Sequence, residues 1–217
     1  MCCLCCLPWL PHASPDPAAN SVELQRQPAA GSVPPLEPIR VYHERQRRHS
    51  CHDLCILHAL NNLYQKKTFT FYELSSIAWK LPHEWNYAPV PFYRAYFNIF
   101  AGNYDANVLQ RLLQTRGAAL SDCAYPTFNN GHFIDLNDPE LVGLILNRGE
   151  LKNRCCRHWA AASKINGVWI NLDSHLDAPV IVGENDAAKN FLQQEIESGT
   201  RVIRVLADPE QDLGILG

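Results

Sequence analysis

An Asn-Gly pair, Asn166-Gly167, separates two short runs of β-forming residues within RHWAAASKINGVWINLDS. Asn-Gly is the strongest short-range signal for a two-residue hairpin turn, because both residues adopt a positive φ at low cost. The turn predicts that Ala160 faces Asp173 across the hairpin, so that His158 lies diagonal to Asp173 and within side-chain reach. The C-terminal half of the chain must therefore contain an antiparallel sheet.

Helical periodicity dominates the chain before the hairpin. The segments with this spacing are 55–64 after a capping Asp53, 70–81 with a Thr70/Glu73 capping box, and 105–116, between a capping Asp105 and Gly117. PELVGLILN, residues 139–147, predicts another short helix that starts at Pro139. Residues 186–198 predict a last helix, and TRVIRVLA predicts a last strand. Helices that precede antiparallel strands are typical of the α+β class.

The start of the chain differs in composition from the rest. SPDPAAN and GSVPPLEPI are rich in proline and small residues, which predicts a disordered Cys/Pro-rich segment over residues 1–39. We expect one globular catalytic domain over residues 40–207 and a short tail over residues 208–217.

Four cysteines crowd the opening MCCLCCLPWLP, namely Cys2, Cys3, Cys5 and Cys6. This apolar run of about ten residues is too short to span a bilayer. Acylation of several of these thiols would instead hold the protein at a membrane surface. Two alternatives stay open, because the segment could have no role or its four thiols could bind zinc.

The whole chain carries a formal net charge of −3 and nine cysteines. The acidic balance argues against a nucleic-acid partner, because proteins that bind phosphate backbones usually carry a basic excess. An odd number of cysteines without a signal peptide is typical of a reducing compartment. We therefore expect a cytoplasmic protein, which is membrane-associated if its N-terminal cysteines are acylated.

Cys55 is a candidate nucleophile. If Asp53 caps the helix, Cys55 lies in its first turn, where exposed N–H groups and the helix dipole stabilise a thiolate. The candidate bases are His58, one turn further on, and His158, which Asp173 would orient as in a catalytic triad. The alternatives are that Cys55 is an ordinary core thiol and that His158 and Asp173 are a surface pair.

A structural zinc site is a competing interpretation. The residues with suitable side chains are Cys51, His52, Cys55, Cys155, Cys156 and His158. Their spacing is not that of two C-x-x-C knuckles, and no set of four stands out. We therefore expect no metal and no cofactor.

Three separated motifs resemble, in order, those of the Josephin-domain cysteine proteases. They are VYHERQRR…DLCILHALNNL, GNYDANVLQRLLQTRG and RHWAAASKINGVWINLDS. The resemblance covers roughly residues 40–207 and is closest to the short members of the family, which are little more than the domain. It implies a papain-like α+β fold, with an N-terminal helical part on a small antiparallel sheet. It also implies a deubiquitinase whose partners are ubiquitin and ubiquitinated proteins, and we expect it to be a monomer.

The resemblance also implies roles for four residues. Cys55 matches the nucleophile, His158 the general base and Asp173 the residue that orients this base. Gln46 matches a glutamine that helps to form the oxyanion hole, which stabilises charge on the attacked carbonyl. The thiolate would attack the C-terminal glycine of ubiquitin and form a thioester that water hydrolyses.

One spacing departs from the family. Gln46 and Cys55 are nine positions apart, where the family has about five, so HSCH or a neighbouring stretch is an insertion. Cys51 has the family spacing, but only Cys55 is followed by the helical ILHALNN, so we predict Cys55 as the nucleophile. The insertion leaves open whether Gln46 serves an oxyanion hole. It also keeps open a catalytically weak, membrane-tethered ubiquitin-binding module.

Overall fold

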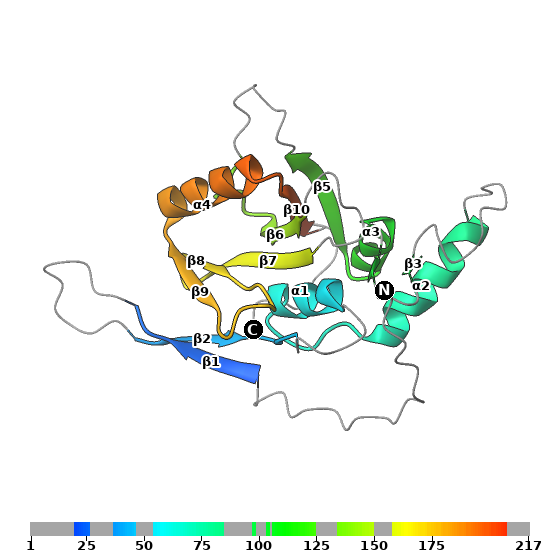
Figure 1. Ribbon diagram of the computed structural model, residues 1–217, viewed down its shortest axis with the longest axis horizontal. Coiled ribbons are helices and arrows are strands. Elements are labelled where there is room, and N and C mark those ends of the chain that lie inside the picture. The colour runs from blue at the N-terminus through cyan, green and yellow to red at the C-terminus, as the bar shows by residue number, and fades with distance from the viewer. Residues whose placement is uncertain are drawn as a thin grey trace, which may run out of the picture.

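A six-stranded antiparallel sheet forms the centre of the protein (Figure 1). The computed structural model describes residues 20–26, 37–46, 54–84, 97–98, 103–104, 106–124, 134–149 and 158–207. The strands, in spatial order, are β5 (Ala118–Ala124), β10 (Arg201–Ala207), β6 (Leu141–Arg148), β7 (His158–Ile165), β8 (Val168–Asn171) and β9 (Val180–Gly183). Two short pairs stand apart from this sheet: β1 (Ser21–Leu24) with β2 (Ile39–Tyr42), and β3 (Phe97–Asn98) with β4 (Asn103–Tyr104).

Helices cover both faces of the sheet. The helices are α1 (Cys55–Leu63), α2 (Phe71–Glu84), α3 (Ala106–Gln114) and α4 (Asn185–Glu197). Buried residues of α1, α2 and α3 form one core with one face of the sheet, and buried residues of α4 form a second core with the other face. Figure 1 shows α1 and α4 on these opposite sides. The predicted α+β class is confirmed, with an N-terminal helical part packed on an antiparallel sheet.

The hairpin has the register that the sequence predicted. Asn166 and Gly167 both have a positive φ, of 49° and 82°, and Ile165 pairs with Val168 beside them. Pairing continues beyond β8, because the N–H of Leu172 donates a hydrogen bond of 2.8 Å to the carbonyl oxygen of Ala161. The next residue along this strand direction is Asp173, so the register of a local turn determines where this carboxylate lies.

Helix α2 begins with the predicted capping box. The N–H and the hydroxyl of Thr70 each donate to Oε2 of Glu73 at 2.8 Å, and the N–H of Glu73 donates back to Oγ1 of Thr70 at 3.3 Å. The helices expected after Asp53 and Asp105 are present as α1 and α3, but both aspartates lie outside the described residues. Leu54 occupies the N-cap position of α1 and makes no side-chain cap.

The helix predicted from PELVGLILN is wrong, because residues 141–148 form the inner strand β6. Leu144 and Leu146 belong to the core with α4, whereas Ile145 between them belongs to the core with α1. A strand that is buried on both faces has no polar side, so its sequence loses the alternation that identifies most strands. Its short apolar run is then indistinguishable from a piece of buried helix.

The sequence predicted that residues 1–39 are disordered, but part of this segment is ordered in the structure. Strand β1 pairs antiparallel with β2, and Leu24 packs against the core of the domain. Arg26 donates a hydrogen bond to the carbonyl oxygen of Asn166, so this segment also contacts the hairpin turn. The expectation of disorder is therefore wrong for Ser21–Leu24, while the boundaries at residues 39 and 207 stay predictions. Cys2, Cys3, Cys5 and Cys6 lie outside the described residues.

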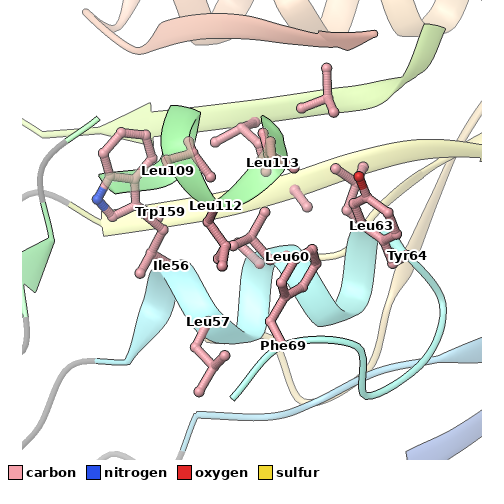
Figure 2. Close-up of a cluster of buried hydrophobic side chains, with 14 of the residues drawn as sticks. Ile56, Leu57, Leu60, Leu63, Tyr64, Phe69, Leu109, Leu112, Leu113 and Trp159 are labelled. Atoms are coloured by element: carbon pink, nitrogen blue, oxygen red, sulfur yellow. The ribbon is translucent and has the colours of Figure 1, made fainter. Parts of the chain in front are cut away.

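Packing against β7 holds α1 on the sheet. Figure 2 shows Ile56, Leu60 and Leu63 on the face of α1 that packs against β7, in one core with buried leucines of α3. Leu63, the last residue of α1, approaches the sheet closely because Gly143 of β6 has no side chain. A Cβ atom added to Gly143 would lie 2.5 Å from Cδ1 of Leu63 and 2.8 Å from the carbonyl oxygen of Ala162. Leu63 therefore lies beside Ala162 of β7.

Candidate active site

Cys55 is the first residue of α1, and its side chain is buried. The eight residues back from Leu63 span about 12 Å of helix. The four residues back from Ala162 to His158 span about 13 Å of strand. Because Leu63 lies near Ala162 and the helix and the strand run in the same direction, these matching lengths place Cys55 at the same end of the structure as His158. Figure 2 agrees, since Ile56 lies next to Trp159.

His158 and Asp173 form the pair that the hairpin register predicted. Nε2 of His158 lies 2.6 Å from Oδ1 of Asp173, and both side chains are largely buried. A neutral imidazole that donates from Nε2 keeps Nδ1 as an acceptor. This arrangement leaves Nδ1 available to exchange a proton with another group, which is what a general base requires.

The Asp173 carboxyl group is an anion in this environment. Burial raises its pKa, but the hydrogen bond and charge of His158, the N–H of His175 and the charge of Arg148 outweigh burial and lower the pKa to about 2. Asp173 is thus ionised throughout the neutral range. It can stabilise a positive charge on His158 and fix the orientation of the ring.

Gln46 lies beside this pair although the chain between Gln46 and Cys55 is longer than in the resembling family. The N–H of Gln46 donates a hydrogen bond of 2.8 Å to the carbonyl oxygen of Ser174, and the Gln46 side chain is buried. Ser174 directly follows Asp173, so Gln46 is attached to the segment that orients His158. Cys51 lies outside the described residues, so its position stays a prediction.

Comparison with known proteins identifies the family. The sequence model of the Josephin family matches residues 50–206. This chain belongs to the Josephin family. It is 38% identical over 169 residues to a Josephin-like protein of Arabidopsis thaliana, with 72% of this chain and 45% of that protein covered. Human Josephin-2 is 34% identical over 185 residues (81% and 88% covered), and human ataxin-3 is 28% identical over 183 residues (77% and 46% covered).

The chain therefore spans less than half of the Arabidopsis protein and of ataxin-3, and most of Josephin-2. Membership relates this chain to a family of the cysteine-protease, deubiquitinase type, as its motifs implied. The match includes Cys55, His158 and Asp173, and Gln46 precedes the matched range.

Glu44 organises a buried polar network next to the candidate active site of this Josephin domain. Its carboxylate accepts hydrogen bonds from the Tyr42 hydroxyl at 2.6 Å and from Asn61 at 3.1 and 3.2 Å, and it lies 2.8 Å from Nδ1 of His58. Its N–H donates to Oδ1 of Asn62. His58, the alternative base of the sequence analysis, is thus engaged with Glu44. No sequence pattern singled out Glu44, because its partners come from separate segments.

Asn62 and His43 attach this network to the site. Nδ2 of Asn62 donates to the carbonyl oxygens of Glu44 at 3.2 Å and of Leu172 at 3.0 Å, so this amide has a structural role. Nε2 of His43 lies 3.0 Å from the carbonyl oxygen of Asp173. Burial lowers the pKa of His43, which outweighs the opposing effect of its contact with Asp173. A neutral His43 thus connects the segment before Gln46 to the Asp173 backbone.

Sequence reasoning missed two residues at the pair. The His175 ring stacks on the His158 ring with a centroid separation of 3.7 Å and an interplanar angle of 7°. Arg148 forms an ion pair with Asp173. His175 is two residues from Asp173 and could have been noticed from the sequence. Arg148 could not, because the residues directly before it, 139–147, were predicted to be a helix rather than a strand beside His158.

His158, Asp173 and His175 are also a group of ligand type, with donor atoms that all lie within 4.8 Å of one another. The lone pairs of an imidazole lie in the ring plane, so two nearly parallel stacked rings cannot both direct nitrogens at one ion. The group thus suits a hydrogen-bonded base better than a metal. Of the zinc ligands considered from the sequence, Cys51, His52, Cys155 and Cys156 lie outside the described residues.

Proposed function

We propose that this Josephin domain is a cysteine-dependent deubiquitinase that cleaves bonds at the C-terminal glycine of ubiquitin. The observation that carries the proposal is the His158–Asp173 pair, at 2.6 Å, at the end of β7 that α1 approaches with Cys55 as its first residue. A thiol at a helix start, a base and an ionised carboxylate are the groups that thiol acyl transfer requires. Membership in the Josephin family supports ubiquitin as the acyl donor.

In the proposed reaction, the Cys55 thiolate forms a bond to the carbonyl carbon of the ubiquitin C-terminal glycine. Protonated His158 gives its proton to the departing lysine amine as the C–N bond breaks, which leaves a thioester. His158 then takes a proton from water, and this water cleaves the thioester and restores the thiolate. Asp173 stabilises the charged imidazolium ring, and Gln46 is proposed to donate a hydrogen bond to the carbonyl oxygen as negative charge develops there.

Reaction with ubiquitin that carries an electrophilic C-terminus tests this proposal. We expect a covalent adduct with the purified chain and with Cys51→Ser, and none with Cys55→Ser, because the proposed thiolate is at Cys55. The adduct is measured by its mass shift of one ubiquitin. An adduct that is lost with Cys51→Ser would show that the assignment across the insertion is wrong.

The insertion before Cys55 motivates a second candidate function, a ubiquitin-binding module with weak or no catalysis. This candidate predicts that the chain binds unmodified ubiquitin in titrations while it forms no adduct. An adduct that forms at Cys55 within minutes would reject it.

We further propose that acylation of Cys2, Cys3, Cys5 and Cys6 attaches the protein to membranes from the cytoplasmic side. Within the described residues, no helix has the length and apolar character needed to cross a bilayer. Changing all four cysteines to serine is expected to move the protein from the membrane fraction of cells to the soluble fraction, because thioester acylation needs the thiols. Wild-type protein that is already in the soluble fraction would contradict the anchor.

A further inference from the structure

Arg148 contacts two carboxylates at once. It is the last residue of β6 and pairs directly with His158 of β7 in the antiparallel register. Its Nη1 donates to Oδ2 of Asp173. Its Nε and Nη2 donate to the two carboxylate oxygens of Glu195 on α4, at 2.9 and 2.5 Å. Arg148 therefore connects the partner of His158 to a helix on the opposite face of the sheet.

The hydrogen bonds of Asp173 are divided between its two oxygens. Oδ1 accepts from Nε2 of His158 at 2.6 Å and from the N–H of His175 at 2.8 Å, whereas Oδ2 is engaged by Arg148. A carboxylate is planar, so contacts to both oxygens determine the rotation of the group. Without Arg148, the carboxylate could turn about its own axis and lengthen its bond to His158.

Glu195 keeps the guanidinium group in place. Two parallel hydrogen bonds between a guanidinium and a carboxylate restrict both groups more than a single contact does. Oε2 of Glu195 also accepts a hydrogen bond of 2.8 Å from the Thr200 hydroxyl. The side chains of Arg148, Asp173 and Glu195 are only 24%, 7% and 14% exposed, so solvent screens this chain of contacts less than a surface ion pair.

We propose that Arg148 is a positioning residue for the catalytic base: it holds the Asp173 carboxylate in the orientation that directs His158, and Glu195 anchors it. The inference rests on the roles that the proposed function gives His158 and Asp173. A purely structural role, in which Arg148 only ties α4 to the sheet, would affect stability but not the chemistry of Cys55.

The test compares Arg148→Met with wild type in two assays. The first measures kcat and KM for ubiquitin with a fluorogenic C-terminal amide. The second measures the rate at which iodoacetamide alkylates Cys55 between pH 5 and pH 9, in a Cys51→Ser background because both cysteines lie on one tryptic peptide. We expect kcat to fall about tenfold with KM unchanged, and alkylation at neutral pH to slow by about the same factor.

Arg204→Met is the matched control. Arg204 lies on β10 of the same sheet and pairs with Asp138 at 3.7 Å, with exposed fractions of 21% and 23% that are close to that of Arg148. It should lose a similar amount of packing and leave both rates unchanged. Arg148→Lys keeps a positive charge but not the planar guanidinium group that bonds two carboxylates at once, so we expect it to restore only part of the lost rate.

The outcomes separate the two proposals. If Arg148→Met matches Arg204→Met in both assays, the positioning role is overturned. If wild type cleaves no ubiquitin substrate, while Arg148→Met and Asp173→Ala both slow alkylation of Cys55, the deubiquitinase proposal fails and the positioning role stands. If Arg148→Met does not fold, Glu195→Gln carries the test: a loss of about threefold in both rates supports the proposal, and unchanged rates in folded protein overturn it.

Discussion

Replacing His158 with glutamine is expected to lower kcat for ubiquitin hydrolysis by about 10³-fold, because general acid–base catalysis by a positioned side chain contributes about 10²–10⁴-fold. Glutamine fills a similar volume and keeps an amide within reach of Asp173, but it cannot exchange a proton with Cys55 or the leaving amine. The melting temperature should fall only slightly, since glutamine can still donate a hydrogen bond to Asp173 and His158 lies at the end of its strand. Steady-state hydrolysis of ubiquitin with a fluorogenic C-terminus measures the loss.

His58→Gln is the matched control. His58 and His158 each lie within hydrogen-bonding distance of a carboxylate, at 2.8 Å from Glu44 and 2.6 Å from Asp173. Because the His58 contact belongs to the structural network, His58→Gln should lower stability while kcat for the folded fraction stays within about twofold of wild type. If His58→Gln abolished turnover and His158→Gln did not, the base would be His58, as the alternative in the sequence analysis has it.

Replacing Glu44 with alanine is expected to lower the free energy of unfolding by about 3–5 kcal/mol, because several buried groups lose the charged acceptor that they share, and each buried polar group left unsatisfied costs about 1–3 kcal/mol. The change leaves donors from Tyr42, His58 and Asn61 without the carboxylate that they share. It also opens a cavity between α1 and the segment that ends at Gln46. Urea unfolding at pH 7, followed by circular dichroism, measures the change.

Glu23→Ala provides the comparison. Glu23 pairs with Arg40 at 3.4 Å, with side chains 59% and 76% exposed, so its loss should change stability by less than about 1 kcal/mol. If Glu44→Ala had an effect this small, the buried network would not contribute to folding as we infer.

The effect of Glu44 also depends on pH. Burial raises the pKa of Glu44, but hydrogen bonds from His58, Tyr42 and Asn61 outweigh burial, so the pKa lies below its ordinary value of 4.5. A lowered pKa in the folded state means that the carboxylate stabilises the fold above about pH 4.5 and loses this contribution as the pH falls further. The difference between wild type and Glu44→Ala should therefore shrink under acid conditions.

Local signals in the sequence predicted local structure well. Asn166-Gly167 determines its hairpin through the φ angles that a two-residue turn requires, so the approach of His158 to Asp173 follows from counting along two strands. The capping box was also predictable, because Thr70 and Glu73 bond to each other within four residues of sequence. The residues that specify each feature lie within a few positions of one another in the sequence.

Features that depend on packing between distant segments were not predictable. β6 has the composition of a buried helix because α1 covers one of its faces and α4 the other, and only the assembled sheet shows this. Arg148 meets Asp173 and Glu195 across 25 and 47 positions of sequence. Glu44 meets His58 across 14 positions and an insertion. No pattern within a single window contains such pairs.

The backbone bond from Gln46 to Ser174 has a consequence for how such sites diverge. The hydrogen bond to Ser174 holds Gln46, and the packing of α1 holds Cys55. Insertions or deletions between these two residues can therefore occur without moving either of them. Lengthening a connection whose ends are held costs little free energy, since the loop-closure term grows only with the logarithm of length. A sequence pattern that demands one fixed interval between the glutamine and the cysteine would therefore overlook family members such as this chain, whereas a pattern with a variable gap and a required helix after the cysteine would retain them.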